Sequence, residues 1–250
     1  MRGGGSGVAA VVGVVGAVGG AGASVCAAGL ARAAHRDGDH VVLVDLETRG
    51  GGPDVLLGIE PEPGLRWADL HGARGTLDGA ALVARLPAWC DVPVLGAARD
   101  RPEAIDPQVV VDVCAAVADA CDLLVLDLPR WVATQPRDLG AAVLGACDAL
   151  VLVTPLDLPG VAGALAARYV LTETGARHLA LVTRGPAPGR LSPWEVSDAV
   201  GLPLAAAVRW DPRLAGAVER GEGPPSGARS ALGRAGRELA SWVRSPGAAR

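Results

Sequence analysis

The sequence predicts an α/β protein with a mostly parallel, doubly wound sheet and helices on both faces. Uninterrupted apolar runs such as residues 8–15 and 149–153 are typical of strands buried on both sides. Segments with helical spacing separate these runs, which indicates βαβ units. We expect one three-layer α/β/α domain over residues 1–250, with flexible ends at 1–7 and 245–250.

The elements follow in order along the chain. Strands are expected at residues 8–15, 41–44, 92–95, 122–127, 149–153, 178–183 and 204–208. Helices are expected at residues 24–35, 77–86, 107–121, 136–147, 158–174, 192–200 and 228–243, with a short turn at 54–59 and irregular chain at 60–76. Ser24 and Ser192 stand where N-caps belong. Pro93 places its strand near an edge of the sheet.

Composition excludes several classes of protein. Half of the 250 residues are apolar, which is enough for a large core, and the net charge of −4 argues against nucleic acid. The five cysteines form no C-x-x-C pair, so we expect buried, reduced thiols and a cytoplasmic protein. No stretch has the length of a membrane span, and the short, glycine-broken apolar run near the start does not fit a signal peptide.

Residues 16–24 read Gly-Ala-Val-Gly-Gly-Ala-Gly-Ala-Ser and connect the first strand to the first helix. Glycines let consecutive backbone N–H groups point at an anion at a helix N-terminus, so this layout is typical of a phosphate-binding loop. Such loops end in Gly-Lys-Ser/Thr. Here Ala23 takes the lysine position, and the chain contains no lysine.

Polar residues gather where the predicted strands end. Asp45 and Glu47 follow the second strand, Asp127 ends the strand at 122–127, and Thr154 and Arg184 follow two later strands. Ligands of parallel sheets bind at the carboxyl edge. We therefore expect these groups to lie around the glycine loop.

The motifs together resemble the MinD/ParA/CpaE group of deviant Walker A P-loop ATPases, which implies a P-loop NTPase sheet. The group's loop, K-G-G-x-G-K-[ST], is similar to residues 18–24. Its strand-two signature resembles residues 45–47 and 50–58, its Walker B strand resembles 123–129, and its late D-P segment resembles 211–222. Segments 64–67, 127–130 and 184–189 look most like the actinobacterial CpaE-like branch, often described as septum-site-determining and associated with Tad pilus or secretion genes. Because the loop starts near residue 16, we expect the chain to lack that branch's receiver-like N-terminal domain.

The resemblance implies roles for individual residues. Nucleotide would contact the loop and Arg184, which gives Gly19, Gly20, Ala21, Gly22, Ala23, Ser24, Val25 and Arg184. Mg²⁺ would be held by Ser24, Asp45 and Asp127, and Glu47 and Asp127 would be the catalytic carboxylates. The family's two loop lysines are replaced by Val18 and Ala23, and Glu47 replaces an aspartate.

These replacements predict weak or absent binding of ATP or ADP with Mg²⁺. A charge-assisted hydrogen bond contributes about 1.5–3 kcal/mol, so losing two weakens binding by roughly two to four decades. Phosphoryl transfer depends on positioned charge, so hydrolysis suffers more. An arginine at Arg49, Arg130 or Arg184 is the alternative source of charge, in which case the protein is a weak ATPase.

The expected role is a septum-site or Tad pilus/secretion positioning and regulatory factor with protein partners and a possible homodimer. Three alternatives stay open. The glycine spacing also fits a NAD(P)-binding short-chain dehydrogenase, with Asp45 on the ribose. A pure interaction scaffold would not use the loop. The last helix, with Trp242 on its apolar stripe, either covers the sheet, which we favour, or binds a membrane surface.

Overall fold

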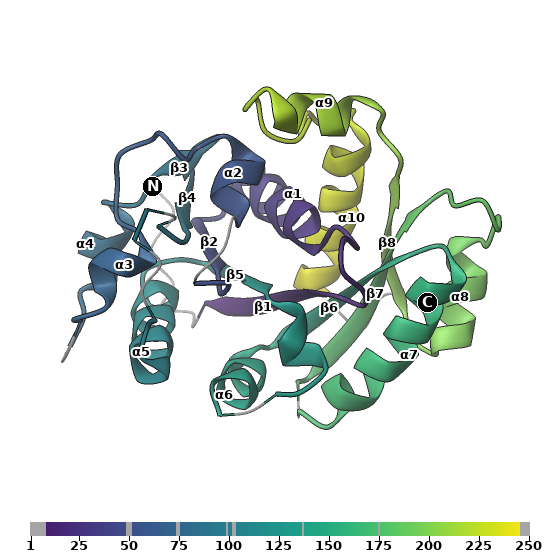
Figure 1. Cartoon of the computed structure of the whole chain (residues 1–250), viewed down its shortest axis with the longest axis horizontal. Coiled ribbons are helices and arrows are strands. Elements are labelled where there is room, and N and C mark those ends of the chain that lie inside the picture. The colour runs from purple at the N-terminus through teal and green to yellow at the C-terminus, as the bar shows by residue number, and fades with distance from the viewer. Residues whose placement is uncertain are drawn as a thin grey trace.

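The computed structural model describes residues 9–48, 52–73, 76–98, 100–101, 104–136, 138–174 and 176–245. Its centre is an eight-stranded sheet in the order β3-β4-β2-β5-β1-β6-β7-β8 (Figure 1). The strands are β1 (Ala10–Gly16), β2 (Val41–Asp45), β3 (Ala88–Trp89), β4 (Val92–Leu95), β5 (Leu123–Leu128), β6 (Ala149–Pro155), β7 (His178–Gly185) and β8 (Leu204–Arg209). All pairs are parallel except β3 with β4. The predicted fold class is confirmed.

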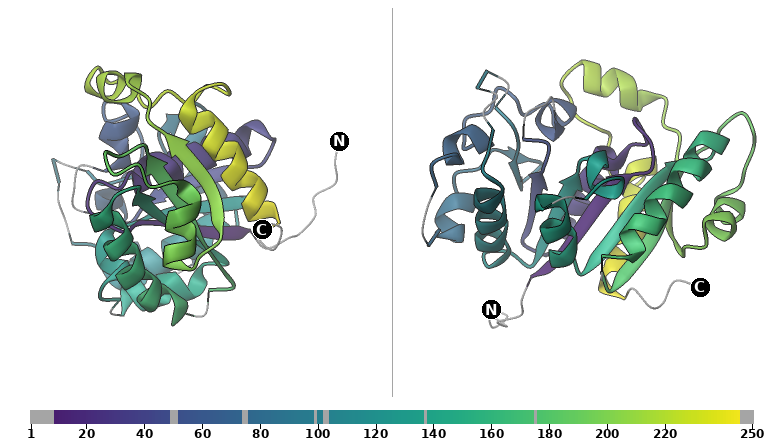
Figure 2. Two further views of the ribbon diagram at one scale, coloured as in Figure 1. Left: turned by 90° about the vertical axis from the view of Figure 1, so that its right-hand side faces the viewer. Right: turned by 60° about the horizontal axis from the view of Figure 1, so that its bottom comes forward.

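The helices are α1 (Ala23–Arg36), α2 (Pro53–Leu57), α3 (Trp67–Leu70), α4 (Gly79–Val83), α5 (Pro107–Ala118), α6 (Leu139–Ala146), α7 (Leu158–Thr172), α8 (Pro193–Val200), α9 (Arg213–Glu219) and α10 (Ala231–Arg244), with a 3₁₀ turn η1 (Arg130–Ala133). Helices α1 and α10 cover one face of the sheet, and α5, α6 and α7 cover the other (Figures 1 and 2). Each face has its own apolar cluster, because the central strands are buried on both sides.

Strand order decides against the dehydrogenase alternative. In the dinucleotide-binding fold the second strand lies directly beside the first. Here β5 lies between them: Val125 of β5 pairs with Val12 of β1 on one side and with Leu43 of β2 on the other. The prediction of a strand near an edge at β4 is correct, since only β3 lies outside it.

Several sequence predictions need correction. The chain at 60–76 is not all irregular, because Trp67 begins α3, and α9 and β3 were not predicted. The helix predicted from residue 136 begins at Leu139. Not every cysteine is buried: Cys26 and Cys147 are, but Cys90 is exposed, in a turn where its φ of 50° is positive. Arg49 and the ends at 1–7 and 246–250 lie outside the described residues.

Helix α10 packs on the sheet and on α1. Leu239 and Trp242 are buried in the cluster that α1 shares, and Gly236 lies against the carbonyl of Gly29. The interpretation of this helix as a cover for the sheet is therefore confirmed. Among the described residues, no helix combines the length and the apolar character that crossing a membrane requires.

Candidate functional site

The loop between β1 and α1 forms a cradle of backbone N–H groups. Gly20 and Gly22 adopt positive φ angles of 71° and 95°, a conformation that favours glycine. Only one turn bond closes the loop, from the Ala21 N–H to the Val18 carbonyl at 3.3 Å. The N–H groups of Gly19, Gly20 and Gly22 donate to no other described group. The loop is thus free to bind an anion.

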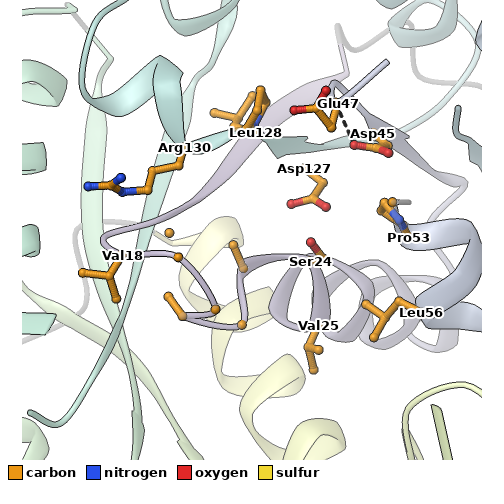
Figure 3. Close-up of a pocket in the computed structure, with 18 of the residues that line it drawn as sticks. Val18, Ser24, Val25, Asp45, Glu47, Pro53, Leu56, Asp127, Leu128 and Arg130 are labelled. Atoms are coloured by element: carbon orange, nitrogen blue, oxygen red, sulfur yellow. Dashed lines mark hydrogen bonds between the residues drawn. The ribbon is translucent and has the colours of Figure 1, made fainter. Parts of the chain in front are cut away.

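Helix α1 begins one residue earlier than its predicted cap. Gly22 is the N-cap, so Ser24 is not the cap but lies inside the first turn. The first-turn N–H groups have no intrahelical acceptor and carry the positive end of the helix dipole. The Ser24 hydroxyl instead faces the Asp127 carboxylate (Figure 3).

Two buried carboxylates lie opposite this loop. Asp45 is the last residue of β2 and Asp127 the last but one of β5; they are register partners, with exposed fractions of only 1% and 5%. One Asp45 oxygen accepts the Glu47 N–H at 2.8 Å, while its other oxygen is buried without a hydrogen-bond partner among the described residues. Parallel pairing explains the convergence, because it aligns the strand ends.

Burial changes the protonation of both acids. Desolvation raises the pKa of Asp127 to about 7, although hydrogen bonding to Ser24 acts in the opposite direction. Desolvation also raises the pKa of Asp45 well above its usual range, and the charge of Asp127 adds to this effect. The pair therefore favours a bound proton or a cation near neutral pH.

Among the described residues that line this pocket, two arginines are the only cationic side chains, and both lie against the loop. Arg184 donates from Nη2 to the Gly20 carbonyl at 3.0 Å, and its side chain passes beside Gly22. Arg130 donates from Nε to the Ala17 carbonyl at 3.5 Å and points away from the two carboxylates (Figure 3). Neither guanidinium lies between Asp45 and Asp127.

The sequence-predicted site residues line one pocket of about 680 Å³, except for Thr154, which is fully buried and does not line it. Its lining includes the loop from Val18 to Val25, together with Asp45, Glu47, Asp127 and Arg184. A pocket of this size suits a ligand as large as a nucleotide. The Val18 side chain lies at the rim of the pocket and points away from the two carboxylates (Figure 3). It lies near Gly163 of α7.

Sequence reasoning missed three contributors. Gly52 lines the pocket, and a Cβ there would meet the free Asp45 oxygen at 1.9 Å. Trp67 is fully buried and donates from Nε1 to the Asp45 carbonyl at 2.6 Å, which holds the end of β2. Pro53 and Leu56 of α2 form a wall. The glycine run before Pro53 was the only signal in the sequence for this wall.

Comparison by sequence finds uncharacterized relatives. No protein-family model matches the chain. Uncharacterized proteins from two strains of Mycobacterium tuberculosis are 41% identical over 199 residues, which is 80% of this chain and 54% of each relative. The chain thus spans about half the length of the curated relatives it matches.

Comparison by structure finds solved ATPases. A ParA family ATPase from Chlorobium tepidum superposes with a TM-score of 0.78 at 21% identity, over 95% of this chain and 98% of that one. MinD from Pyrococcus horikoshii complexed with Mg-ADP gives 0.76 at 20% identity, over 96% and 98%. MinD in the MinC:MinD cell division complex of Aquifex aeolicus gives 0.76 at 17%, over 94% and 96%. The chain has the fold of the ParA and MinD ATPases.

Proposed function

We propose that the chain is a MinD/ParA-type protein of the CpaE-like branch. In this proposal its nucleotide site keeps the phosphate-binding backbone loop but lacks the two lysines of that loop. In this proposal it acts as a positioning and regulatory factor for septum placement or for a Tad-type pilus or secretion machine. The fold that the chain shares with MinD of the MinC:MinD cell division complex supports the cell-division part of this proposal. The protein would then exert its effect by binding partner proteins.

One observation carries the proposal: the free N–H groups of the loop face two buried carboxylates, and no lysine accompanies them. The N–H cradle would still accept phosphate oxygens. The carboxylates would repel those oxygens, because no cationic side chain among the described residues of the lining lies between Asp45 and Asp127. Weak binding of nucleotide and poor hydrolysis follow.

The residues fit a magnesium ion. The Ser24 hydroxyl, the Asp127 carboxylate and the free oxygen of Asp45 are the hard oxygen ligands that Mg²⁺ prefers. When bound, Mg²⁺ would supply the positive charge that the missing lysines do not. Any affinity for ATP or ADP should therefore depend strongly on Mg²⁺.

Calorimetric titration of ATP and ADP, with Mg²⁺ and with EDTA, tests the proposal. We expect weak binding that needs Mg²⁺, and no turnover above that of Asp127→Ala. Tight binding without Mg²⁺, or hydrolysis that Asp127→Ala abolishes, would overturn the proposal of a degraded site. Gly22→Asp places a side chain in the loop. If the protein is a pure interaction scaffold, this variant should capture the protein partner in a pull-down as well as the wild type does; otherwise capture should be reduced.

A weak ATPase that uses Arg184 is the second candidate, because this arginine already lies on the loop at Gly20. Arginine binds phosphate oxygens through its planar fork. If Arg184 replaces the lost lysine, Arg184→Gln weakens nucleotide binding about tenfold or more. Arg130→Gln is the matched control, since its guanidinium is directed away from the carboxylates.

A further inference from the structure

A cluster of arginines surrounds the loop before α10, away from the carboxylate pair. Arg36 of α1 donates to the Ser226 carbonyl at 2.5 Å, and Arg237 of α10 donates to the Ala228 carbonyl at 2.6 Å. Arg234 donates to the Arg229 carbonyl, and Arg229 itself is exposed. Because residues 226–229 are consecutive, the guanidinium groups of Arg36, Arg234 and Arg237 are held on one short loop that also contains Arg229. We name these four residues the arginine patch.

Among the described residues, none of the four arginines of the patch forms an ion pair. The pKa of Asp211 is lowered mainly by hydrogen bonds from Arg213, with a smaller effect of Arg234. Asp211 is thus already engaged by Arg213, at 3.0 Å. The patch keeps its positive charge in a protein of net charge −4.

The donors of the patch are mostly unused. Each guanidinium has five N–H donors, and Arg36, Arg234 and Arg237 each make one side-chain hydrogen bond to a carbonyl. These bonds hold the side chains in place before a ligand arrives, which lowers the entropy lost on binding. The N-terminus of the 14-residue α10 adjoins the patch and adds a positive dipole end.

We infer that the arginine patch binds an acidic peptide segment of a partner protein. Arginine forks match carboxylates in bidentate geometry. The patch is short, and acidic groups border it: Asp211 lies on one side, and Asp37 and Asp39 pair with Arg244 at the far end of α10. A nucleic acid duplex extends past the patch and would meet these acids, whereas a short run of carboxylates can be bound within the patch.

The test uses the full chain and a fluorescein-labelled octaglutamate peptide, followed by anisotropy at low and moderate salt. We expect saturable binding that weakens as salt increases. Arg234→Gln/Arg237→Gln should weaken it by about three- to thirtyfold, from two charge pairs at a surface. The control is Arg177→Gln/Arg190→Gln, which removes the same charge from two exposed residues outside the patch and should leave the affinity within about twofold.

Three results would overturn the inference: no saturable binding of the peptide, equal loss of affinity in both double variants, or a 20-base-pair DNA duplex that binds more tightly with the same dependence on Arg234 and Arg237. Thermal unfolding checks that both variants are folded. The inference is independent of the nucleotide pocket, so Asp127→Asn should bind the peptide as the wild type does.

Discussion

Asp45 and Asp127 are register partners on neighbouring parallel strands, and both are almost completely buried. The described structure places no cationic side chain between them. In a chain without lysine, this arrangement has an electrostatic consequence even in the absence of ligand, because two desolvated carboxylates repel each other.

Asp127→Asn should stabilise the protein at alkaline pH. The folded-state pKa of about 7 exceeds the ordinary value of 3.8, so the folded state retains a proton between about pH 4 and 7 that the unfolded chain has lost. Stability therefore falls as pH rises through this window, by up to about 4 kcal/mol. Urea unfolding at pH 5 and pH 8 with EDTA should show a flatter pH dependence for the variant.

Glu60→Gln is the control for this experiment, because it removes a negative charge from an exposed side chain. It should change stability by less than about 0.5 kcal/mol at either pH. Equal stability of the wild type at pH 5 and pH 8 would contradict the assignment of a buried, ionisable carboxylate at residue 127.

Ala23→Lys should increase affinity for ATP with Mg²⁺. Ala23 is the first residue of α1 and lines the pocket, so a lysine there would reach phosphate oxygens. One charge-assisted hydrogen bond predicts a gain of about ten- to hundredfold. Ala141→Lys places the same charge on the exposed surface of α6 and should leave the calorimetric affinity unchanged. If both variants bind alike, the absence of lysine from the loop does not limit affinity.

Gly236→Ala should destabilise the packing of α10 on α1. A Cβ at residue 236 would lie 2.4 Å from the Gly29 carbonyl oxygen, and that backbone atom cannot move without shifting α1. Overpacking of this kind destabilises by about 1–3 kcal/mol. Gly145→Ala in α6 meets nothing within 4 Å and should instead stabilise by up to about 1 kcal/mol. Denaturant unfolding of both variants measures the difference, and a stabilising Gly236→Ala would show that the two helices are not in close contact.

Trp67→Phe should loosen the end of β2. The indole N–H is the side-chain donor to the Asp45 carbonyl, and phenylalanine leaves that carbonyl without it. An unmet buried acceptor costs about 1–3 kcal/mol. Trp194→Phe, at a side chain that is 59% exposed, should change the free energy of unfolding by less than about 0.5 kcal/mol. If Trp67→Phe has the same free energy of unfolding as the control, the hydrogen bond from Trp67 to the Asp45 carbonyl does not contribute to stability.

The pattern of the sequence was sufficient for the regular elements and insufficient for their ends. The run at residues 149–153 of β6 is apolar throughout and typical of a strand buried on both faces, so this strand was predicted correctly. The start of α1 was misplaced because serine is a favoured N-cap residue, which pointed to Ser24. In the structure the N-cap is Gly22, whose αL conformation sets the start of the helix at Ala23. Helix α3 was missed because its four residues are too few to show a helical period.

The sequence by itself determined the parallel α/β architecture, the glycine loop and the missing lysines, because these depend on local composition and spacing. Only the tertiary structure decided that β5 lies between β1 and β2, and hence that Asp45 and Asp127 are neighbours. It also decided that Arg184 rests on Gly20 and that Trp67 holds Asp45. These contacts join residues far apart in the chain, and sequence spacing does not specify which strand ends meet.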